Sequence, residues 1–267
     1  MRHAILFSGM THRRHLNGLE FCYRTLVDRL GFERRNVSVL THDGSLCTVD
    51  GRDGTPACEP WPGDGSPFRM SVAGPGTHRA LQRVLGRLHG QLGPSDRLFI
   101  YTSGHGGNHG DGRGPELIVH PHWQRYRVGE FCADLGRLPR HRALVVMMSQ
   151  CFAGGFQDGV LAASRAETTC FVSAASALSA SHALADDDDW DGFARHWIAA
   201  LGGHDVDGAR IVMPDGEYDG PLGDARRAFD YANHPDYRDP LDRPAFATTG
   251  FTYSRPPSPE QHATATG

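Results

Sequence analysis

The chain has 267 residues, of which 39% are hydrophobic and 22% are charged, with a formal net charge of -4 at pH 7. This composition is ordinary for a globular protein, and the length suits one large domain with a sizeable core. The acidic balance argues against a nucleic-acid surface, because phosphate binding needs clustered lysine and arginine, and no apolar stretch is long enough to cross a membrane.

The N-terminus and the cysteines together favour a cytoplasmic location. The apolar run at residues 4–7 is too short for a signal-peptide core and is not followed by a small-residue cleavage site. The cysteines lack the short paired spacing of a zinc site or a disulfide framework, so we expect reduced thiols. They are Cys22, Cys47, Cys58, Cys132, Cys151 and Cys170. We expect no metal or other cofactor.

Strand-like and helix-like segments alternate along the chain. Short apolar runs bounded by turn or polar residues are typical of strands buried on both faces. They cover residues 4–8, 37–40, 97–102, 143–149 and 169–174. Helical periodicity is present at residues 19–30, 78–92 and 128–138, and a last helix is expected at 222–233. This order predicts an α/β fold with a mostly parallel central sheet and helices on both faces.

Two segments lack periodicity. Residues 41–76 are rich in glycine, proline and aspartate and are expected to form a long loop. Their Asp-Gly pairs indicate turns rather than calcium ligands, because the EF-hand pattern is absent. Residues 256–267 have the composition of a disordered tail. We therefore expect a single domain over residues 1–255.

Two predicted strands end in chemically reactive side chains followed by glycine. The strand at 97–102 leads to His105 and Gly106, and the strand at 143–149 leads to Cys151, with a glycine pair three residues further on. The carboxyl ends of parallel strands form the ligand crevice of such sheets. We therefore expect His105 and Cys151 to share one site.

This pair suits nucleophilic catalysis. A thiol with a pKa of about 8.5 is only slightly ionised at neutral pH, so a nucleophilic cysteine needs a neighbouring base. His105 can take the thiol proton and later protonate a leaving amine, while the backbone N–H groups of Gly106 and Cys151 hold the oxyanion. Loss of one such donor costs roughly 3 to 4 kcal/mol.

These motifs resemble the caspase and legumain clan of cysteine peptidases, in which His-Gly and Cys motifs each follow a hydrophobic strand. The likeness extends to residues 17–26, to the Asp43-Gly44 turn and to residues 191–197, and is greatest to bacterial caspase-like proteins on the legumain side. It spans roughly residues 3–235. The resemblance implies a caspase-like α/β/α sandwich with Cys151 as nucleophile, His105 as its partner and Gly106 as an oxyanion contributor.

The resemblance leaves the polarity of the specificity pocket open. Metacaspases carry an acidic residue two positions before the nucleophile, where this chain has Ser149. Caspases and legumain place an arginine from the loop after the first strand in that pocket, and Arg13 and Arg14 stand in that stretch. Legumain also uses acidic residues in that pocket, and Asp189, at the end of the acidic run at 186–189, is the candidate here. The alternative is that this run is only a solvated loop.

We expect a cysteine-dependent amide-bond hydrolase, an endopeptidase that acts on a peptide or protein through a thioester. One alternative is a peptide ligase, or an amide hydrolase or acyl transferase acting on a small amide. Another is a catalytically silent scaffold. A zinc site at His105 and His109 would need both residues on one helix, and the neighbouring glycines make a helix unlikely there. A serine nucleophile is also disfavoured, because neither Ser103 nor Ser149 sits in a Gly-x-Ser-x-Gly elbow.

Overall fold

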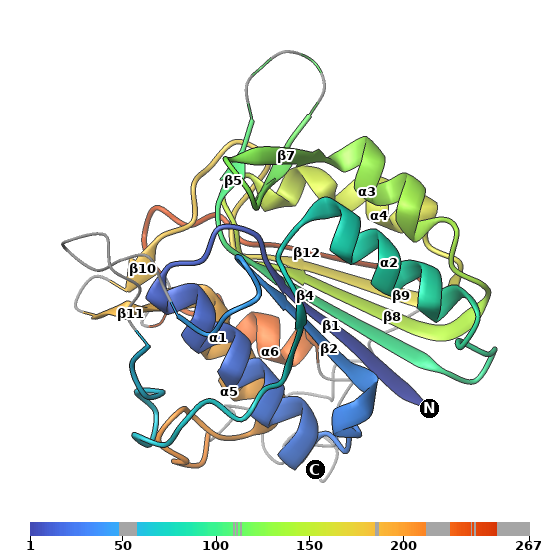
Figure 1. Ribbon diagram of the computed structural model, residues 1–267. Coiled ribbons are helices and arrows are strands. Elements are labelled where there is room, and N and C mark those ends of the chain that lie inside the picture. The colour runs from blue at the N-terminus through green and yellow to red at the C-terminus, as the bar shows by residue number, and fades with distance from the viewer. Residues whose placement is uncertain are drawn as a thin grey trace, which may run out of the picture.

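A seven-stranded sheet forms the centre of the computed structural model, which describes residues 1–47, 58–108, 110, 112, 114–184, 187–211, 225–235, 237 and 239–249. The strand order is β12-β9-β8-β4-β1-β2-β3 (Figure 1). The strands are β1 Arg2–Ser8, β2 Val37–Thr41, β3 Val72–Gly74, β4 Arg97–Ser103, β8 His141–Met148, β9 Ala166–Ser173 and β12 Ala245–Thr249. All neighbours pair in parallel except β12, which runs antiparallel to β9.

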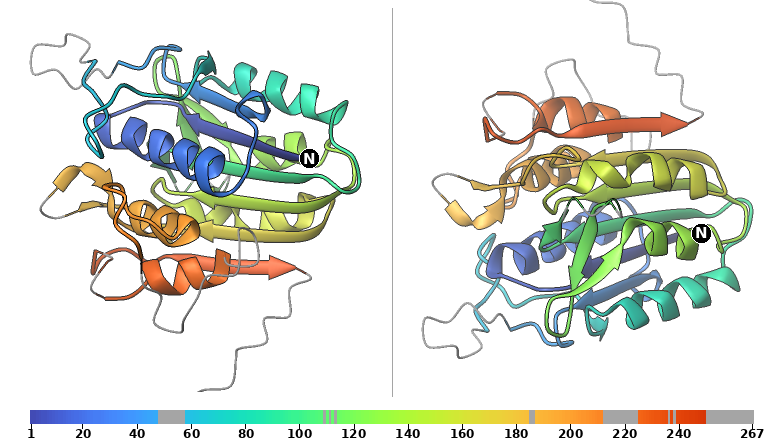
Figure 2. Two further views of the ribbon diagram at one scale, coloured as in Figure 1. Left: turned by 90° about the horizontal axis from the view of Figure 1, so that it is seen from below. Right: turned by 90° about the horizontal axis from the view of Figure 1, so that it is seen from above.

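Helices cover both faces of this sheet (Figures 1 and 2). One face carries α1 Arg13–Arg24, α5 Gly192–Gly202 and α6 Ala225–Ala232. The other carries α2 His78–His89, α3 Val128–Leu135 and α4 Gln157–Ala163. A π-helical turn, Thr25–Arg29, continues α1, and short 3₁₀ helices occupy Arg34–Asn36 and Ala153–Phe156.

Alternating side chains of the strands divide the core in two. In β1, Ala4 and Leu6 join the cluster under α1, α5 and α6, whereas Ile5 and Phe7 join the cluster under α2, α3 and α4. All four side chains are at most 2% exposed. Successive residues of a strand point to opposite faces, so a continuous apolar run feeds both layers. The predicted α/β/α sandwich is confirmed.

The sequence located the inner strands better than the peripheral elements. The five predicted strands correspond to β1, β2, β4, β8 and β9. The first helix begins at Arg13 rather than at residue 19. Two small sheets were not predicted: a three-stranded antiparallel sheet of β5 Gly106–Gly107, β6 Glu116–Val119 and β7 Gln124–Arg127, and a two-stranded antiparallel sheet of β10 Ala183–Leu184 and β11 Asp187–Asp191.

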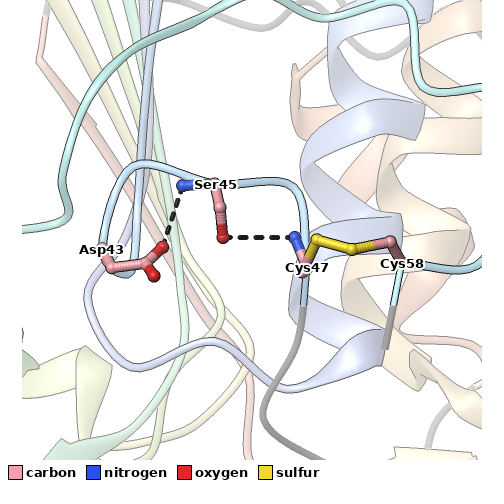
Figure 3. Close-up of a disulfide and its surroundings, with 4 residues drawn as sticks. All are labelled: Asp43, Ser45, Cys47 and Cys58. Carbon is pink, nitrogen blue, oxygen red and sulfur yellow. Dashed lines mark hydrogen bonds between the residues drawn. A yellow bond between two sulfur atoms is a disulfide. The ribbon is translucent and has the colours of Figure 1, made fainter. Parts of the chain in front are cut away.

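The prediction that all cysteines are reduced is wrong for one pair. Cys47 and Cys58 form a disulfide, with Cα atoms 4.4 Å apart (Figure 3). Upstream, the Ser45 N–H donates to Asp43 Oδ1 and the Cys47 N–H donates to Ser45 Oγ (2.9 and 3.3 Å), which turns the chain. A spacing of 11 residues does not reveal this return of the chain. The free cysteines are Cys22, Cys132, Cys151 and Cys170.

The segment at 41–76 is more ordered at its end than a plain loop. Trp61 and Met70 are buried in the core beneath α1, and β3 adds a strand at the edge of the sheet. The predicted tail at 256–267 lies outside the described residues. Over the part of the chain that is described, no helix has the length and apolar character needed to cross a membrane.

Candidate active site

The register of two neighbouring strands brings the two predicted catalytic segments to one edge of the sheet. Thr102 of β4 pairs with Met148 of β8, and His105 and Cys151 each follow three residues later. The Ser149 N–H donates to the Thr102 carbonyl (2.9 Å), and Thr102 Oγ1 donates to the side-chain oxygen of Gln150 (2.8 Å). The strands therefore stay in register up to the reactive residues.

Beyond the strands, the backbones of the two segments are in direct contact at Gly106. A Cβ atom at this position would overlap the carbonyl oxygen of Cys151 and would lie 2.8 Å from Cγ of Gln150. Two residues earlier, Gly104 adopts φ 126°, a conformation that side chains disfavour, and turns the chain past Ser8. Glycine at these positions lets the segment that carries His105 pass against the segment that carries Cys151.

Aromatic rings surround the partly exposed imidazole of His105. The rings of His12 and His15 meet it edge-on, with centroids 4.7 and 5.4 Å away. Trp123 lies over it at a centroid distance of 5.1 Å and an angle of 31°, although its own side chain is 56% exposed. These contacts restrict the ring of His105 and leave an aromatic surface beside it.

His15 is a neutral neighbour of this imidazole. Burial, together with the positive charge of Arg14 and the nearby histidines, holds the pKa of His15 well below its ordinary value. Its Nδ1 accepts a hydrogen bond from the His12 backbone N–H (3.1 Å), which fixes the lone pair at that nitrogen. His15 therefore packs against His105 without adding a positive charge at neutral pH.

Cys151 sits at a sharp turn between β8 and the 3₁₀ helix. Phe152 adopts a left-handed conformation, φ 61°, and its N–H donates to the Ser179 carbonyl (2.9 Å). The sulfur of Cys151 accepts a hydrogen bond from the Ser181 N–H (3.4 Å) and lies 3.8 Å from both the carbonyl and the hydroxyl oxygen of Ser181. The segment after β9 thus wraps around the thiol.

The carboxylate of Asp191, whose side chain is 11% exposed, connects the ends of the two strands. Ser103 and Ser149, each two residues before His105 or Cys151, donate to Asp191 Oδ2 (3.2 and 3.4 Å). Arg14 Nε donates to Asp191 Oδ1 (3.0 Å). Burial raises the pKa of Asp191, and Arg14 and the two serines oppose that shift.

The predicted specificity residues form two adjacent charge pairs. Arg14 and Ser149 meet at Asp191, while Arg13 pairs with Asp189 (2.8 Å) and also contacts Glu59. Asn17 Nδ2 holds the Asp189 carbonyl (3.0 Å). Arg13 and Arg14 belong to the first turn of α1 rather than to a loop, and the described end of the acidic run is strand β11 rather than a loop. Helix and strand fix both pairs.

Several neighbours of the site were not predicted from the sequence. His12 and His15 are three positions apart and face His105 from the start of α1, a spacing that hinted at one helix face. Asp191 and Ser181 come from a distant segment without a recognisable local signal.

Among the described residues, His182, Asp239 and Asp242 have side-chain atoms of the kinds that bind metal ions within 4.8 Å of one another, and His182 Nδ1 already contacts Asp242 Oδ1 (2.9 Å).

The comparisons with known proteins found a family model and solved structures to which the chain is similar. Residues 81–206, which include His105, Gly106 and Cys151, match the model of the peptidase C13 family. Among solved structures, protein GSU0716 from Geobacter sulfurreducens is similar, with a TM-score of 0.53 and 13% identity over 94% of each chain, a likeness that concerns the fold. A search of curated proteins found no match. Residues 81–206 are therefore similar to the C13 peptidases, which belong to the caspase and legumain clan of cysteine peptidases.

Proposed function

We propose that the protein is a cysteine endopeptidase in which Cys151 is the nucleophile and His105 its acid and base. The contact between Gly106 and the backbone of Cys151 is the observation that carries this proposal. It brings two strand-end segments together, one with a thiol and one with an imidazole, in the segment that matches the C13 family.

The reaction follows from these two groups. The Cys151 sulfur, after giving its proton to His105, attacks the carbonyl carbon of the substrate amide, and the backbone N–H groups of Gly106 and Cys151 stabilise the oxyanion. The C–N bond breaks as His105 returns the proton to the leaving amine. Water then gives a proton to His105 and attacks the thioester, which releases the acid and restores the thiolate.

The two charge pairs favour a neutral polar side chain before the cut bond. Arg14 is paired with Asp191, and Arg13 with Asp189 and Glu59, so each arginine already has a carboxylate partner. A cationic or anionic substrate side chain would have to displace one partner and leave a half-buried charge unpaired. An asparagine side chain both donates and accepts hydrogen bonds, and so complements a guanidinium beside a carboxylate.

A fluorogenic peptide library varied at the residue before the cut, with Asn, Asp, Arg and Lys included, tests this function. We expect hydrolysis to be fastest after Asn, and to fall by at least about a thousandfold in Cys151→Ala and His105→Ala with unchanged thermal melting. Turnover that survives Cys151→Ala contradicts the proposal. Adding an amine nucleophile and analysing the products by mass spectrometry separates hydrolysis from acyl transfer.

A further inference from the structure

One tryptophan is exposed beside the proposed catalytic histidine. Trp123 is 56% exposed, and its ring lies over the imidazole of His105, with 5.1 Å between the ring centroids and 31° between the ring planes. The other three tryptophans are at most 3% exposed: Trp61, Trp190 and Trp197. Packing of the core therefore does not explain the position of Trp123.

A hairpin fixes this ring relative to His105. Residues 120–123 join β6 to β7, and the two strands pair along their whole length. The Ile118 N–H donates to the His105 carbonyl, and the His120 N–H donates to the Gly76 carbonyl (both 3.0 Å). One of these bonds ties the hairpin to the segment that carries the imidazole, so the ring of Trp123 and the imidazole belong to one rigid unit.

The backbone of the turn adopts a conformation that bulky side chains rarely take. His122 and Trp123 have φ angles of 59° and 58°, in the left-handed region. This region is uncommon for residues other than glycine and is an outlier for a large ring. Such strain is typical of functional sites, where the surrounding structure holds a side chain in place for its chemistry.

The proposed reaction determines which part of a substrate lies near this ring. His105 protonates the leaving amine, so the amine nitrogen must come within roughly 3 Å of the imidazole. That nitrogen belongs to the residue after the cut bond, whereas the residue before the cut is bonded to the Cys151 sulfur. A side chain of the residue after the cut is therefore within reach of the exposed ring of Trp123.

We propose that Trp123 binds the side chain of the substrate residue after the cut bond and selects an aliphatic or aromatic one. This inference rests on the proposed roles of His105 and Cys151. An apolar side chain laid on the ring removes both surfaces from water, and an aromatic one adds a ring contact. A lysine or arginine could also lie on the ring, but its charge opposes the imidazolium that forms when His105 takes the thiol proton.

The test uses internally quenched peptides that keep one residue before the cut and vary the residue after it. We expect the kcat/KM of the wild type to be about tenfold higher with Leu or Phe after the cut than with Gly. Trp123→Ala should reduce this ratio to about twofold or less, whereas Trp123→Phe keeps a ring and should retain most of it. The ranking of residues before the cut should be the same in all three proteins.

Gln124→Ala is the matched control. Gln124 is the next residue of the same hairpin and is also exposed, and its backbone N–H donates to the Pro121 carbonyl (3.3 Å), a bond that alanine retains. This variant should keep the wild-type ratio. Circular dichroism and the rate of Cys151 alkylation by iodoacetamide check the fold and the thiol. If Trp123→Ala does not fold, Trp123→Asn replaces it, because asparagine tolerates the left-handed region.

A wild-type ratio in a folded variant that lacks the ring overturns the proposal. So does a loss of the same size for every residue after the cut, because that places the effect on His105 rather than on the substrate. The two proposals fail in different ways. Turnover that survives Cys151→Ala, or a wild type that cleaves no peptide, refutes the proposed function. A wild type that cleaves through Cys151 without preference after the cut refutes only the role of Trp123.

Discussion

The contact at Gly106 makes a sharp prediction for Gly106→Ala. The new methyl group would overlap the Cys151 carbonyl oxygen and would lie 2.8 Å from Cγ of Gln150 and 3.1 Å from the Cys151 carbonyl carbon. Carbon atoms in contact sit about 3.5 to 4.0 Å apart, so the two backbones must separate by about 1 Å. The cost is steric, because the backbone at position 106 is not in the left-handed region.

A shift of this size should affect activity more than stability. Overpacking of this kind costs about 1 to 3 kcal/mol of unfolding free energy, whereas a displacement of about 1 Å between reacting groups lowers the rate about a hundredfold. We expect Gly106→Ala to remain folded in urea titrations, to lose about two orders of magnitude in peptide hydrolysis and to alkylate more slowly at Cys151.

Gly86→Ala is the control for this substitution. Gly86 lies in α2, and a Cβ there meets no atom within 4 Å, so alanine should stabilise the helix by about 1 kcal/mol and leave hydrolysis unchanged. A folded Gly106→Ala protein that hydrolyses peptide at the wild-type rate would refute the idea that this contact aligns the two segments.

Three further perturbations test the electrostatics and the covalent link. Arg14→Met should lower the unfolding free energy by about 2 kcal/mol at pH 7, below the range for fully buried pairs because Arg14 is 28% exposed. The loss should shrink toward pH 4, since burial already raises the pKa of Asp191 and acid neutralises it; an equal loss at both pH values in urea titrations contradicts this. Burial raises the pKa of Asp242 to about 6 despite its contact with His182, so its folded state binds the proton more tightly and stability falls as pH rises from about 4 to 6. Asp242→Asn should reduce that fall by up to about 3 kcal/mol, and parallel pH profiles of the two proteins would exclude this cause. Reducing the disulfide between Cys47 and Cys58, which are 11 positions apart, should lower the unfolding free energy by up to about 3 kcal/mol, and the Cys47→Ser protein should not respond to reductant in thermal melts.

The sequence predicted the parts of the fold that local pattern controls. Continuous apolar runs such as that of β4 are typical of strands covered on both faces, and the structure places Leu98 and Phe99 in opposite layers. The start of α1 was misplaced because its first turn is polar: His12, Arg13 and Arg14 precede the apolar face. A polar first turn carries no periodic signal, even though here its side chains contact His105 and Asp191.

Small sheets and the disulfide escaped prediction for a different reason. The strand β5 is two glycines, and its strand character comes only from pairing with Leu117 and Glu116 of β6. Cys47 and Cys58 come together because the chain turns back after Asp43. In each case the partner, rather than the segment itself, determines the local structure.

The same distinction explains how much of the candidate site could be predicted. His105 and Cys151 stand at strand ends, so the rule for parallel sheets was enough to place them at one edge. The sequence left open the sign of charge in the predicted specificity pocket, because it shows each charged side chain without its partner. In the structure, Arg14 bonds a carboxylate 177 positions away. That carboxylate, Asp191, also accepts hydrogen bonds from the Ser103 and Ser149 hydroxyls. One distant residue thus connects the ends of both strands to the arginine. A substrate side chain entering there meets a matched pair rather than an arginine or an acid, which is why we expect a neutral amide to be preferred over either charge.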